Sequence, residues 1–415
     1  MATNGANNGN HNGARGQHSR DVVILGAART PQGKFLGALA GLSAAELGKV
    51  AFKAAVERSG INAADVAEVI VGNVVSAGTG QALPRQISIG AGVPDTVGGI
   101  TVNKVCGSGL KAVMLASNAI KSEDGEVYLA GGVESMSRAP YLNDSLRTGN
   151  KYGHVTVRDS LQHDGLWCSI VDWGMGNAAE FIGRQLEVTR DEMDEFAYRS
   201  HQLAAKATSE GKFKAEIAPV TMKTRKGDQV IDTDEPIRAD TTLEALAALK
   251  PAFETDGSVT AGNAPGMNDG SAALVVASRE YAERNGHKPL ARIVAYGQAA
   301  VDPQWIFYAP VKAIPVALER AGWTADEVDL FEINEAFASQ VLADMRGLER
   351  QGINIPMEKV NVHGGAIALG HPLGASGARV LVTLIHALQD RGGKRGIAAL
   401  CLGGGEAVAM AVELE

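Results

Sequence analysis

The feature that most constrains this chain is a short segment that occurs twice. Residues 55–66, AVERSGINAADV, align without a gap with residues 317–328, ALERAGWTADEV, and the two segments agree at six of twelve positions. In each copy a helix-like stretch ends at a glycine, Gly60 or Gly322, and an apolar run follows. The separation of 262 residues is far too long for a solenoid repeat, so the sequence predicts a duplicated domain.

Both copies continue with the same alternation of elements. In each, a strand leads through a glycine-rich turn and a helix to a second strand, predicted at 101–105, 110–121 and 126–130 and again at 359–362, 375–388 and 397–402. A further helix is predicted to begin at Ser43, because Ser43 and Glu46 have the spacing of a capping box. Alternating strands and helices predict an α/β fold with parallel sheets covered by helices.

The region between the two copies has a different character. Residues 139–265 are more polar and less periodic, and we interpret them as a loop domain inserted into the first half. The halves would then comprise residues 21–288 and 289–415. Residues 1–20, which are biased towards Asn and Gly without an amphipathic period, are predicted to form a disordered tail.

Composition narrows the functional classes. The chain has 39 Lys and Arg against 47 Asp and Glu, a net charge of −8, which disfavours general nucleic-acid binding. No apolar run approaches the ~18 residues needed to span a membrane. The three cysteines share no C-x-x-C spacing, so neither a disulfide framework nor a structural zinc site is indicated. We expect a soluble, cytoplasmic protein without nucleic-acid or membrane partners.

Cys106 lies on the turn between a predicted strand and a predicted helix, in the segment CGSG. The positive end of the helix dipole favours a thiolate at such a place. The glycines also let a substrate and backbone N–H groups approach closely. The alternative is a small buried apolar residue, as most intracellular cysteines are. The motif alone leaves both interpretations open.

Three further residues stand at similar turns. Cys401 ends an apolar strand, and open parallel sheets place ligands at such strand ends. His371 immediately precedes a helix, and a histidine paired with a cysteine activates its thiol. Asn334 follows a strand, where asparagine is more often a helix cap than a catalyst. Taken singly, each also fits a structural role. His363 has no further Cys or His spacing that would support a metal site.

Together these segments resemble the thiolase family. The matching pieces lie in family order and the resemblance covers 21–415; they are VNKVCGSGLKA (102–112), GGVESMSRAP (131–140), AGNAPGMNDG (261–270), EINEAFA (332–338), GGAIALGHPLGASG (364–377) and CLGGG (401–405). The resemblance implies two stacked halves, each a β-α-β-α-β-α-β-β unit, arranged as layered sheets and helices with a loop domain inserted in the first.

The resemblance also implies a reaction, the reversible Claisen condensation or thiolysis between acetyl-CoA and a second acyl-CoA. Cys106 would take the acyl group after His371 activates its thiol, and Cys401 would move the α-proton of acetyl-CoA. Asn334 would hold a water in one oxyanion hole, and the N–H groups of Cys106 and Gly403 would form the other. Coenzyme A thioesters are then the substrates, no metal or cofactor is expected, and a homodimer or homotetramer is expected.

Several departures from the family pattern concern the substrate pocket. Gly174 stands where many relatives have His, Pro265 replaces a Ser that contacts the pantetheine arm, and the bulky segment 304–310 replaces small residues. Arg225, in the basic stretch 223–226, is a candidate for the coenzyme A phosphates, although a solvated turn is the commoner explanation. The residues expected to bind the substrate are Met175, Arg225, Pro265, Ile306 and Phe307.

The sequence also bears on the length of the acyl substrate and on two alternative functions. The CGSG segment is closer to short-chain members of the family than to degradative ones with CSSG, so a short acyl chain is expected. A ketosynthase-like condensing enzyme typically pairs its cysteine with two histidines and lacks the second cysteine. A non-catalytic acyl-CoA- or lipid-binding relative would lose Cys106 or Cys401. This chain keeps both cysteines.

Overall fold

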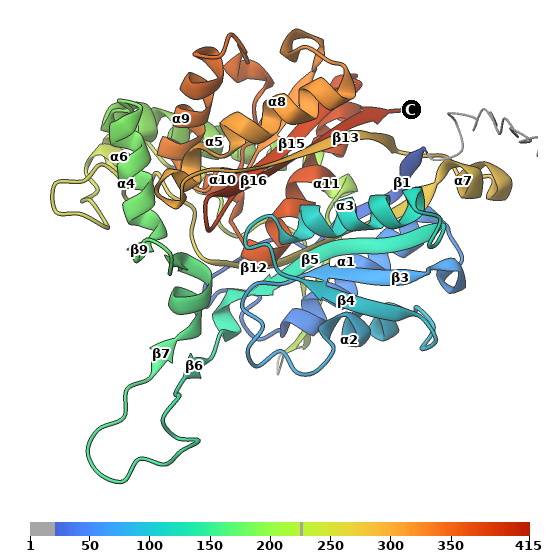
Figure 1. Cartoon of the computed structure of the whole chain (residues 1–415), viewed down its shortest axis with the longest axis horizontal. Coiled ribbons are helices and arrows are strands. Elements are labelled where there is room, and N and C mark those ends of the chain that lie inside the picture. The colour runs from blue at the N-terminus through green and yellow to red at the C-terminus, as the bar shows by residue number, and fades with distance from the viewer. Residues whose placement is uncertain (1–20, 225–226) are drawn as a thin grey trace, which may run out of the picture.

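A computed structural model of the chain describes residues 21–224 and 227–415, so the tail predicted at 1–20 and the predicted phosphate contact Arg225 lie outside the described residues. One large mixed sheet runs through the described part (Figure 1). Its strands are β1 (Val22–Arg29), β2 (Gly33–Lys34), β3 (Glu68–Gly72), β4 (Gly98–Val102), β5 (Val127–Ser135), β12 (Asn268–Ser278), β13 (Ala291–Ala300), β14 (Leu330–Ile333), β15 (Arg395–Leu402) and β16 (Glu406–Leu414).

The remaining elements are helices and short hairpins. The α-helices are α1 (Ala44–Ser59), α2 (Leu83–Gly90), α3 (Ser108–Lys121), α4 (Met175–Gln185), α5 (Arg190–Ser209), α6 (Leu243–Ala247), α7 (Arg279–Asn285), α8 (Pro310–Ala321), α9 (Ala338–Glu349), α10 (Ala366–Leu369) and α11 (Leu373–Arg391). The hairpins pair β6 (Tyr141–Leu142) with β7 (Arg158–Asp159), β8 (Trp167–Cys168) with β9 (Trp173–Gly174), and β10 (Val220–Thr224) with β11 (Gly227–Ile231). Short 3₁₀ turns cover Ala63–Asp65, Met136–Arg138, Lys212–Ala215, Pro303–Tyr308, Ala325–Glu327 and Met357–Lys359, and a π-helical turn covers Leu161–Leu166.

The sheet shows the duplication directly. Its strand order is β14-β15-β16-β13-β1-β12-β5-β3-β4. In the first half β3 and β5 are parallel and β5 and β12 antiparallel, and in the second half β14 and β15 are parallel and β15 and β16 antiparallel. The halves meet where β1 pairs with β13. Helices α3 and α11 pack against each other between the halves, while α1 and α8 cover the outer faces (Figure 1). The predicted duplicated α/β architecture is confirmed.

Local sequence signals explain several helix ends. Ser43 caps α1 and forms a capping box with Glu46, as predicted. The glycines of the repeated segment end α1 and α8, because Gly60 and Gly322 both have a φ of 69°, in the left-handed region that glycine adopts without strain. The repeated sequence therefore encodes the same helix-terminating turn twice.

Two predicted strands differ in the structure. The strand expected at 101–105 ends at Val102, because the side chain of Asn103 accepts a hydrogen bond from the N–H of Val105 and starts a turn. The strand expected at 359–362 is reduced to a bridge between Phe331 and Val360. There the side chain of Asn361 bonds both the N–H and the carbonyl of Ile333, each at 2.8 Å, and so takes the place of a strand ladder.

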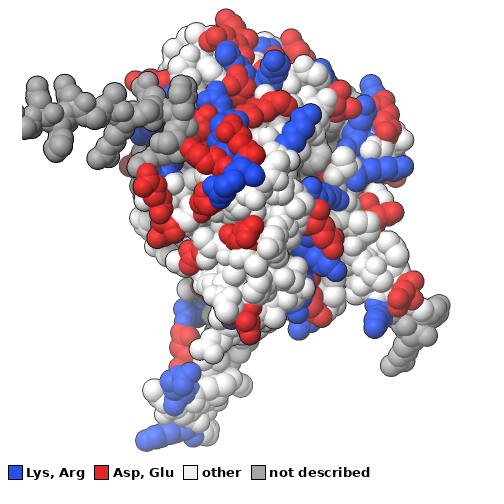
Figure 2. Space-filling model, turned by 90° about the vertical axis from the view of Figure 1, so that its right-hand side faces the viewer, with Lys and Arg blue, Asp and Glu red and all other residues white. Residues whose placement is uncertain are grey.

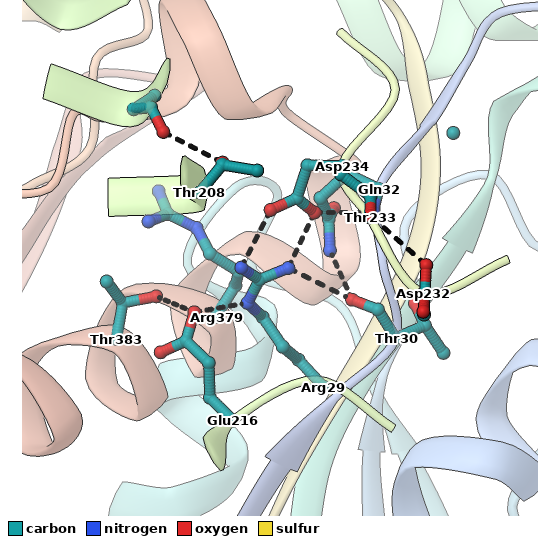
Figure 3. Close-up of polar contacts among 12 residues, drawn as sticks. Arg29, Thr30, Gln32, Thr208, Glu216, Asp232, Thr233, Asp234, Arg379 and Thr383 are labelled. Atoms are coloured by element: carbon teal, nitrogen blue, oxygen red, sulfur yellow. Dashed lines mark hydrogen bonds and ion pairs between the residues drawn. The ribbon is translucent and has the colours of Figure 1, made fainter. Parts of the chain in front are cut away.

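A buried ion cluster fixes the inserted segment to the sheet (Figure 3). Arg29, at the end of β1, is fully buried; its Nε donates to Glu216 at 2.6 Å, and its Nη1 and Nη2 donate to Asp234 at 2.7 and 2.8 Å. Glu216 also accepts a bond of 3.3 Å from Thr383 of α11. One arginine thus joins the first half, the inserted segment and, through Glu216, the second half.

We expect Arg29→Met to destabilise the fold by about 3–5 kcal/mol, because it leaves two buried carboxylates without their counter-charge. Denaturant unfolding followed by circular dichroism measures this loss. Arg284→Met is the control, since Arg284 pairs with Glu126 on the surface and its loss should change stability little. A loss below about 1 kcal/mol for Arg29→Met would show that the cluster does not hold the segment.

Candidate active site

Two neighbouring strand ends begin the site. Asn334 follows β14, and Cys401 lies near the end of the parallel strand β15. The N–H of Asn334 donates to the carbonyl of Ala399 at 2.9 Å, which fixes Asn334 beside the end of β15. Both side chains are buried, with Cys401 only 1% exposed. The structure therefore brings these two predicted residues to one edge of the sheet.

Cys106 reaches the same place on a strained turn. Val105 has a φ of 44°, a value that a β-branched residue adopts only under strain. The hydroxyl of Ser108 holds this turn, because it accepts from the N–H of Lys104 at 2.8 Å and donates to the carbonyl of Val105 at 2.6 Å. The turn packs against the end of β15, since a Cβ added at Gly403 would lie 3.1 Å from Val105. The N–H groups of Cys106 and Gly403 both face the Cys106 sulfur.

His371 is placed by the turn that begins α11. Leu373, two residues later, packs with Val105 and Cys106 in one apolar cluster. The Nδ1 of His371 lies 2.6 Å from the hydroxyl of Ser376, and that hydroxyl donates to the carbonyl of Pro372 at 3.0 Å. Because the hydroxyl proton is engaged there, Nδ1 carries the imidazole proton and Nε2 is the basic nitrogen. Among the described residues Nε2 has no hydrogen-bond partner.

The pKa shifts of the site side chains disfavour a thiolate at Cys106. Burial raises the pKa of Cys106 to about 12, with a smaller contribution from the carboxyl of Glu134, although two backbone N–H groups oppose the rise. Burial also raises the pKa of Cys401 well above its usual value. Burial, aided by the charge of Arg379, lowers the pKa of His371 to about 3. These directions favour a thiol beside a neutral imidazole at rest, so burial acts on Cys106 against the helix dipole and outweighs it.

Asn334 has an unusual environment for a helix cap. Its side chain is fully buried, and neither its oxygen nor its nitrogen has a hydrogen-bond partner within the part of the chain that the structure describes. Helix α9, which follows, begins after Phe337 without a side-chain cap. A buried amide with both atoms unpaired is costly unless it meets a ligand or a water. The structural alternative for Asn334, a cap, does not apply.

The predicted substrate residues divide into two groups. Ile306 and Phe307 are buried in the same apolar cluster as Cys401, and Met175 packs against that cluster from the start of α4. Pro265 is partly buried in the loop before β12. The structure thus places three of the predicted residues in or against the apolar cluster that contains one of the two site cysteines.

Asn263 and His363 make structural contacts. Asn263 joins its loop to α5, since its amide nitrogen donates to Asp194 at 2.9 Å, and its oxygen accepts from the N–H of Thr260 within the loop at 2.8 Å. His363 lies 3.3 Å from Asp390, within ion-pair distance. Across residues 21–224 and 227–415 there is no group of three or more His, Cys, Asp or Glu side chains that could hold a metal ion.

Sequence reasoning missed the residues that support His371. The hydroxyl of Ser376 fixes the tautomer of the His371 imidazole. The side chain of Asn268 accepts a hydrogen bond from the backbone N–H of His371 at 2.9 Å, and Glu134 accepts one from the backbone N–H of Gly374 at 2.8 Å. A signal was present for Glu134, because an acidic residue stands inside the apolar strand segment around 127–135. Such a residue is buried and must be hydrogen-bonded.

Comparison with known proteins agrees with this geometry. The thiolase N-terminal domain matches residues 22–280, and the thiolase C-terminal domain matches residues 287–414. Acetyl-CoA acetyltransferases from Cupriavidus necator and Pseudomonas aeruginosa are each 50% identical to the chain, over 394 and 392 residues. These alignments cover 95% and 94% of the chain and 99% and 98% of those proteins.

Solved structures of two acetyl-CoA acetyltransferases have the same fold as this chain. The crystal structure of the Bacillus anthracis acetyl-CoA acetyltransferase has a TM-score of 0.92 and 45% identity, covering 96% of this chain and 100% of that one. The Syntrophomonas wolfei acetyl-CoA acetyltransferase has a TM-score of 0.94 and 40% identity at the same coverage. With both halves matched in sequence and in fold, the chain belongs to the thiolase family.

Proposed function

We propose that this protein is an acetyl-CoA acetyltransferase that condenses two acetyl units, or cleaves acetoacetyl-CoA, through an acyl-enzyme on Cys106. One observation carries the proposal: the turn of Cys106 packs both against the turn of His371, whose basic nitrogen has no partner among the described residues, and against the end of β15, the strand that carries the second thiol, Cys401. Relatives of about 50% identity bear the same activity in their names.

The first half-reaction transfers the acyl group. As the Cys106 sulfur attacks the thioester carbonyl, Nε2 of His371 accepts the thiol proton, so that the nucleophile becomes anionic only during the attack. The N–H groups of Cys106 and Gly403 donate to the developing oxyanion. The bond from the carbonyl carbon to the coenzyme A sulfur then breaks, and the departing thiolate receives the proton from His371.

The second half-reaction forms the carbon–carbon bond. Cys401 gives its thiol proton to His371 and, as a thiolate, removes an α-proton from the methyl group of acetyl-CoA, while a water held by Asn334, together with the protonated His371, stabilises the enolate oxygen. The nucleophilic carbon attacks the acyl thioester on Cys106, and the departing Cys106 sulfur takes the proton back from His371, which restores both thiols and the neutral imidazole. Thiolysis runs the same steps in reverse. Because side chains, N–H groups and one water supply every role, we propose that no metal or cofactor is required.

The walls of the site favour a short acyl chain. Ile306 and Phe307 are fully or nearly fully buried in the apolar cluster that contains Cys401, and the neighbouring Trp305 packs against Phe181 and Tyr308 with ring centroids 5.5 and 5.6 Å apart. Side chains of this size leave less room for a long acyl chain than small residues would. The two alternatives, a ketosynthase-like enzyme and a non-catalytic binder, are not favoured, because both cysteines are present in one site.

We also propose that the protein forms a homodimer or a homotetramer. Strand β4 ends the sheet, and Ile100 on it is 49% exposed, which leaves an edge that a second copy can pair with. The arm that carries β6 and β7 projects from the molecule with exposed apolar side chains such as Tyr152 and with basic groups near its end (Figures 1 and 2). These two surfaces are the natural contacts for further copies.

The proposed location is the cytoplasm. All three cysteines are free thiols, and the proposed reaction needs two of them reduced, which a reducing compartment ensures. Within the described residues there is no helix long and apolar enough to cross a membrane.

Substrate kinetics test the proposal as a whole. We expect kcat/KM for thiolysis of acetoacetyl-CoA to exceed that for a C8 3-ketoacyl-CoA, since each methylene that does not fit costs roughly 10–200-fold. Steady-state thiolysis assays with both substrates make the comparison. A preference for C8 would refute the short-chain assignment, and no thiolysis of either would refute the function.

We expect Cys106 and Cys401 to act in different half-reactions, which a substitution of Cys401 can show. We expect Cys401→Ser to be acetylated on Cys106 by acetyl-CoA at near the wild-type rate, but to lose condensation by about 10²–10⁴-fold, because a hydroxyl is a poor base for a carbon acid. Mass spectrometry of the digested protein and a condensation assay give the two rates. Cys168→Ser is the control, since Cys168 is a buried cysteine on β8, outside the proposed chemistry. Equal losses in both steps would contradict the assignment.

The pH dependence should reveal the resting thiol. With the pKa of Cys106 near 12 and that of His371 near 3, the thiolate fraction rises about tenfold per pH unit between pH 7 and pH 9.5. We therefore expect alkylation of Cys106 by iodoacetamide, which consumes thiolate, to rise with that slope and without a plateau. Peptide mapping identifies the modified residue. A plateau near neutral pH would indicate a preformed thiolate–imidazolium pair instead.

A further inference from the structure

Glu134 is a buried carboxyl to which the mechanism above assigns no role. It lies on β5, is 1% exposed, and accepts hydrogen bonds at both oxygens. Oε1 accepts from the amide of Asn73 at 2.9 Å and from the N–H of Val75 at 3.1 Å. Oε2 accepts from the N–H groups of Val74 at 3.0 Å and Gly374 at 2.8 Å. Four donors therefore converge on one side chain.

These donors come from the two segments that frame the nucleophile and its base. Val75 belongs to the apolar cluster that contacts Cys106, and Gly374 follows His371 in the turn that begins α11. The first segment is part of the first half of the duplicated fold, and the second is part of the other half. Glu134 is thus bonded at once to the surroundings of Cys106 and to the turn of His371.

The turn of His371 has little room to move. The backbone N–H of His371 donates to Asn268 on β12, the strand next to β5. The first half therefore holds the turn at two points, Asn268 and Glu134. A Cβ added at Gly374 would lie 2.8 Å from Oε2 of Glu134, and one added at Gly370 would lie 2.6 Å from the Asn268 side chain. Contacts this close place the backbone of the turn directly against both holding groups.

We propose that Glu134 is a positioning residue that sets His371 relative to Cys106 across the boundary between the two halves. The proposal rests on the function proposed above. A carboxylate suits this task because each of its oxygens accepts two N–H bonds, whereas a glutamine of the same shape has only one accepting oxygen. Burial raises the pKa of Glu134 to about 7, while the hydrogen bonds from Gly374, Val74, Val75 and Asn73 favour its carboxylate form. When ionised, Glu134 disfavours the Cys106 thiolate, so its charge alone has the opposite effect.

Two variants of Glu134 distinguish position from charge. Glu134→Gln removes the charge and two of the four acceptor positions, and Glu134→Asp keeps the charge but is too short to reach both segments. We expect both to slow acylation of Cys106 by p-nitrophenyl acetate about 10–100-fold, because small misplacements of a catalytic group cost that much. The KM for acetoacetyl-CoA should stay within threefold in both, while kcat for thiolysis falls with the acylation rate.

The control is Glu180→Gln. Glu180 is also buried and accepts backbone N–H bonds, from Ser258 and Val259, but none from the turns of Cys106 or His371. It should change the acylation rate less than threefold. Thermal unfolding confirms that each variant is folded, and Glu134→Asp carries the test if Glu134→Gln does not fold.

The possible results separate cleanly. Faster acylation in Glu134→Gln with a wild-type rate in Glu134→Asp would mean that Glu134 acts through its charge, and it would overturn the proposal. Unchanged rates in both would overturn it too. p-Nitrophenyl acetate needs the Cys106–His371 pair but no coenzyme A site. A wild-type protein that reacts with this ester but not with acetoacetyl-CoA would therefore refute the proposed function and leave the role of Glu134 intact.

Discussion

The two halves of this protein meet backbone against backbone, and the site depends on that contact. Helices α3 and α11, one from each half, begin side by side, and glycines occupy the points of closest approach. A Cβ added at Gly132 would lie 1.9 Å from the carbonyl oxygen of Gly374, and one added at Gly377 would lie 2.4 Å from the N of Leu110. No side chain fits where the start of α11 meets β5, which carries Gly132, or the start of α3. These contacts hold the turns that carry Cys106 and His371 close to each other.

Buried charge adds a second constraint of a different kind. The cluster around Arg29 docks the inserted segment, and Arg379 on α11 bonds Glu332 on β14 at 2.9 Å in the interior of the second half. Arg379 also contributes to the low pKa of His371, after burial itself. An ion pair that holds a helix to its sheet thereby helps to keep the imidazole of His371 neutral. Arg379 therefore contributes both to the packing of α11 and to the pKa of His371.

The sequence was informative wherever a local signal decides the outcome. The repeated segment predicted the duplication, and the capping box at Ser43 and the glycine turns at Gly60 and Gly322 are found as predicted. The strand at 359–362 was wrong because the contact that replaces it, from Asn361 to Ile333, joins residues far apart in the chain. Long-range contacts of this kind leave no periodic trace.

The site residues also divide into features that a local sequence signal indicates and features that depend on long-range contacts. Residue type and turn position indicated Cys106, His371 and Cys401, but not the direction in which the pKa of Cys106 is shifted. The helix dipole is a local property that can be inferred from sequence, whereas desolvation depends on everything packed around the sulfur. Here desolvation is the larger effect. The supporting residues Glu134 and Ser376 also escaped notice, because their importance lies in bonds to partners that only the folded chain brings near.

The protonated resting state of Cys106 has a consequence for survival under oxidative conditions. Peroxide attacks thiolates and not thiols, so a sulfur that is neutral at rest resists conversion to sulfenic acid. In the proposed cycle the sulfur loses its proton only as it bonds to an acyl carbon, and the anion has no lifetime in solvent. With Cys106 as the proposed nucleophile, its raised pKa leaves little thiolate for peroxide to attack between turnovers, whereas a standing thiolate would be exposed to oxidation throughout.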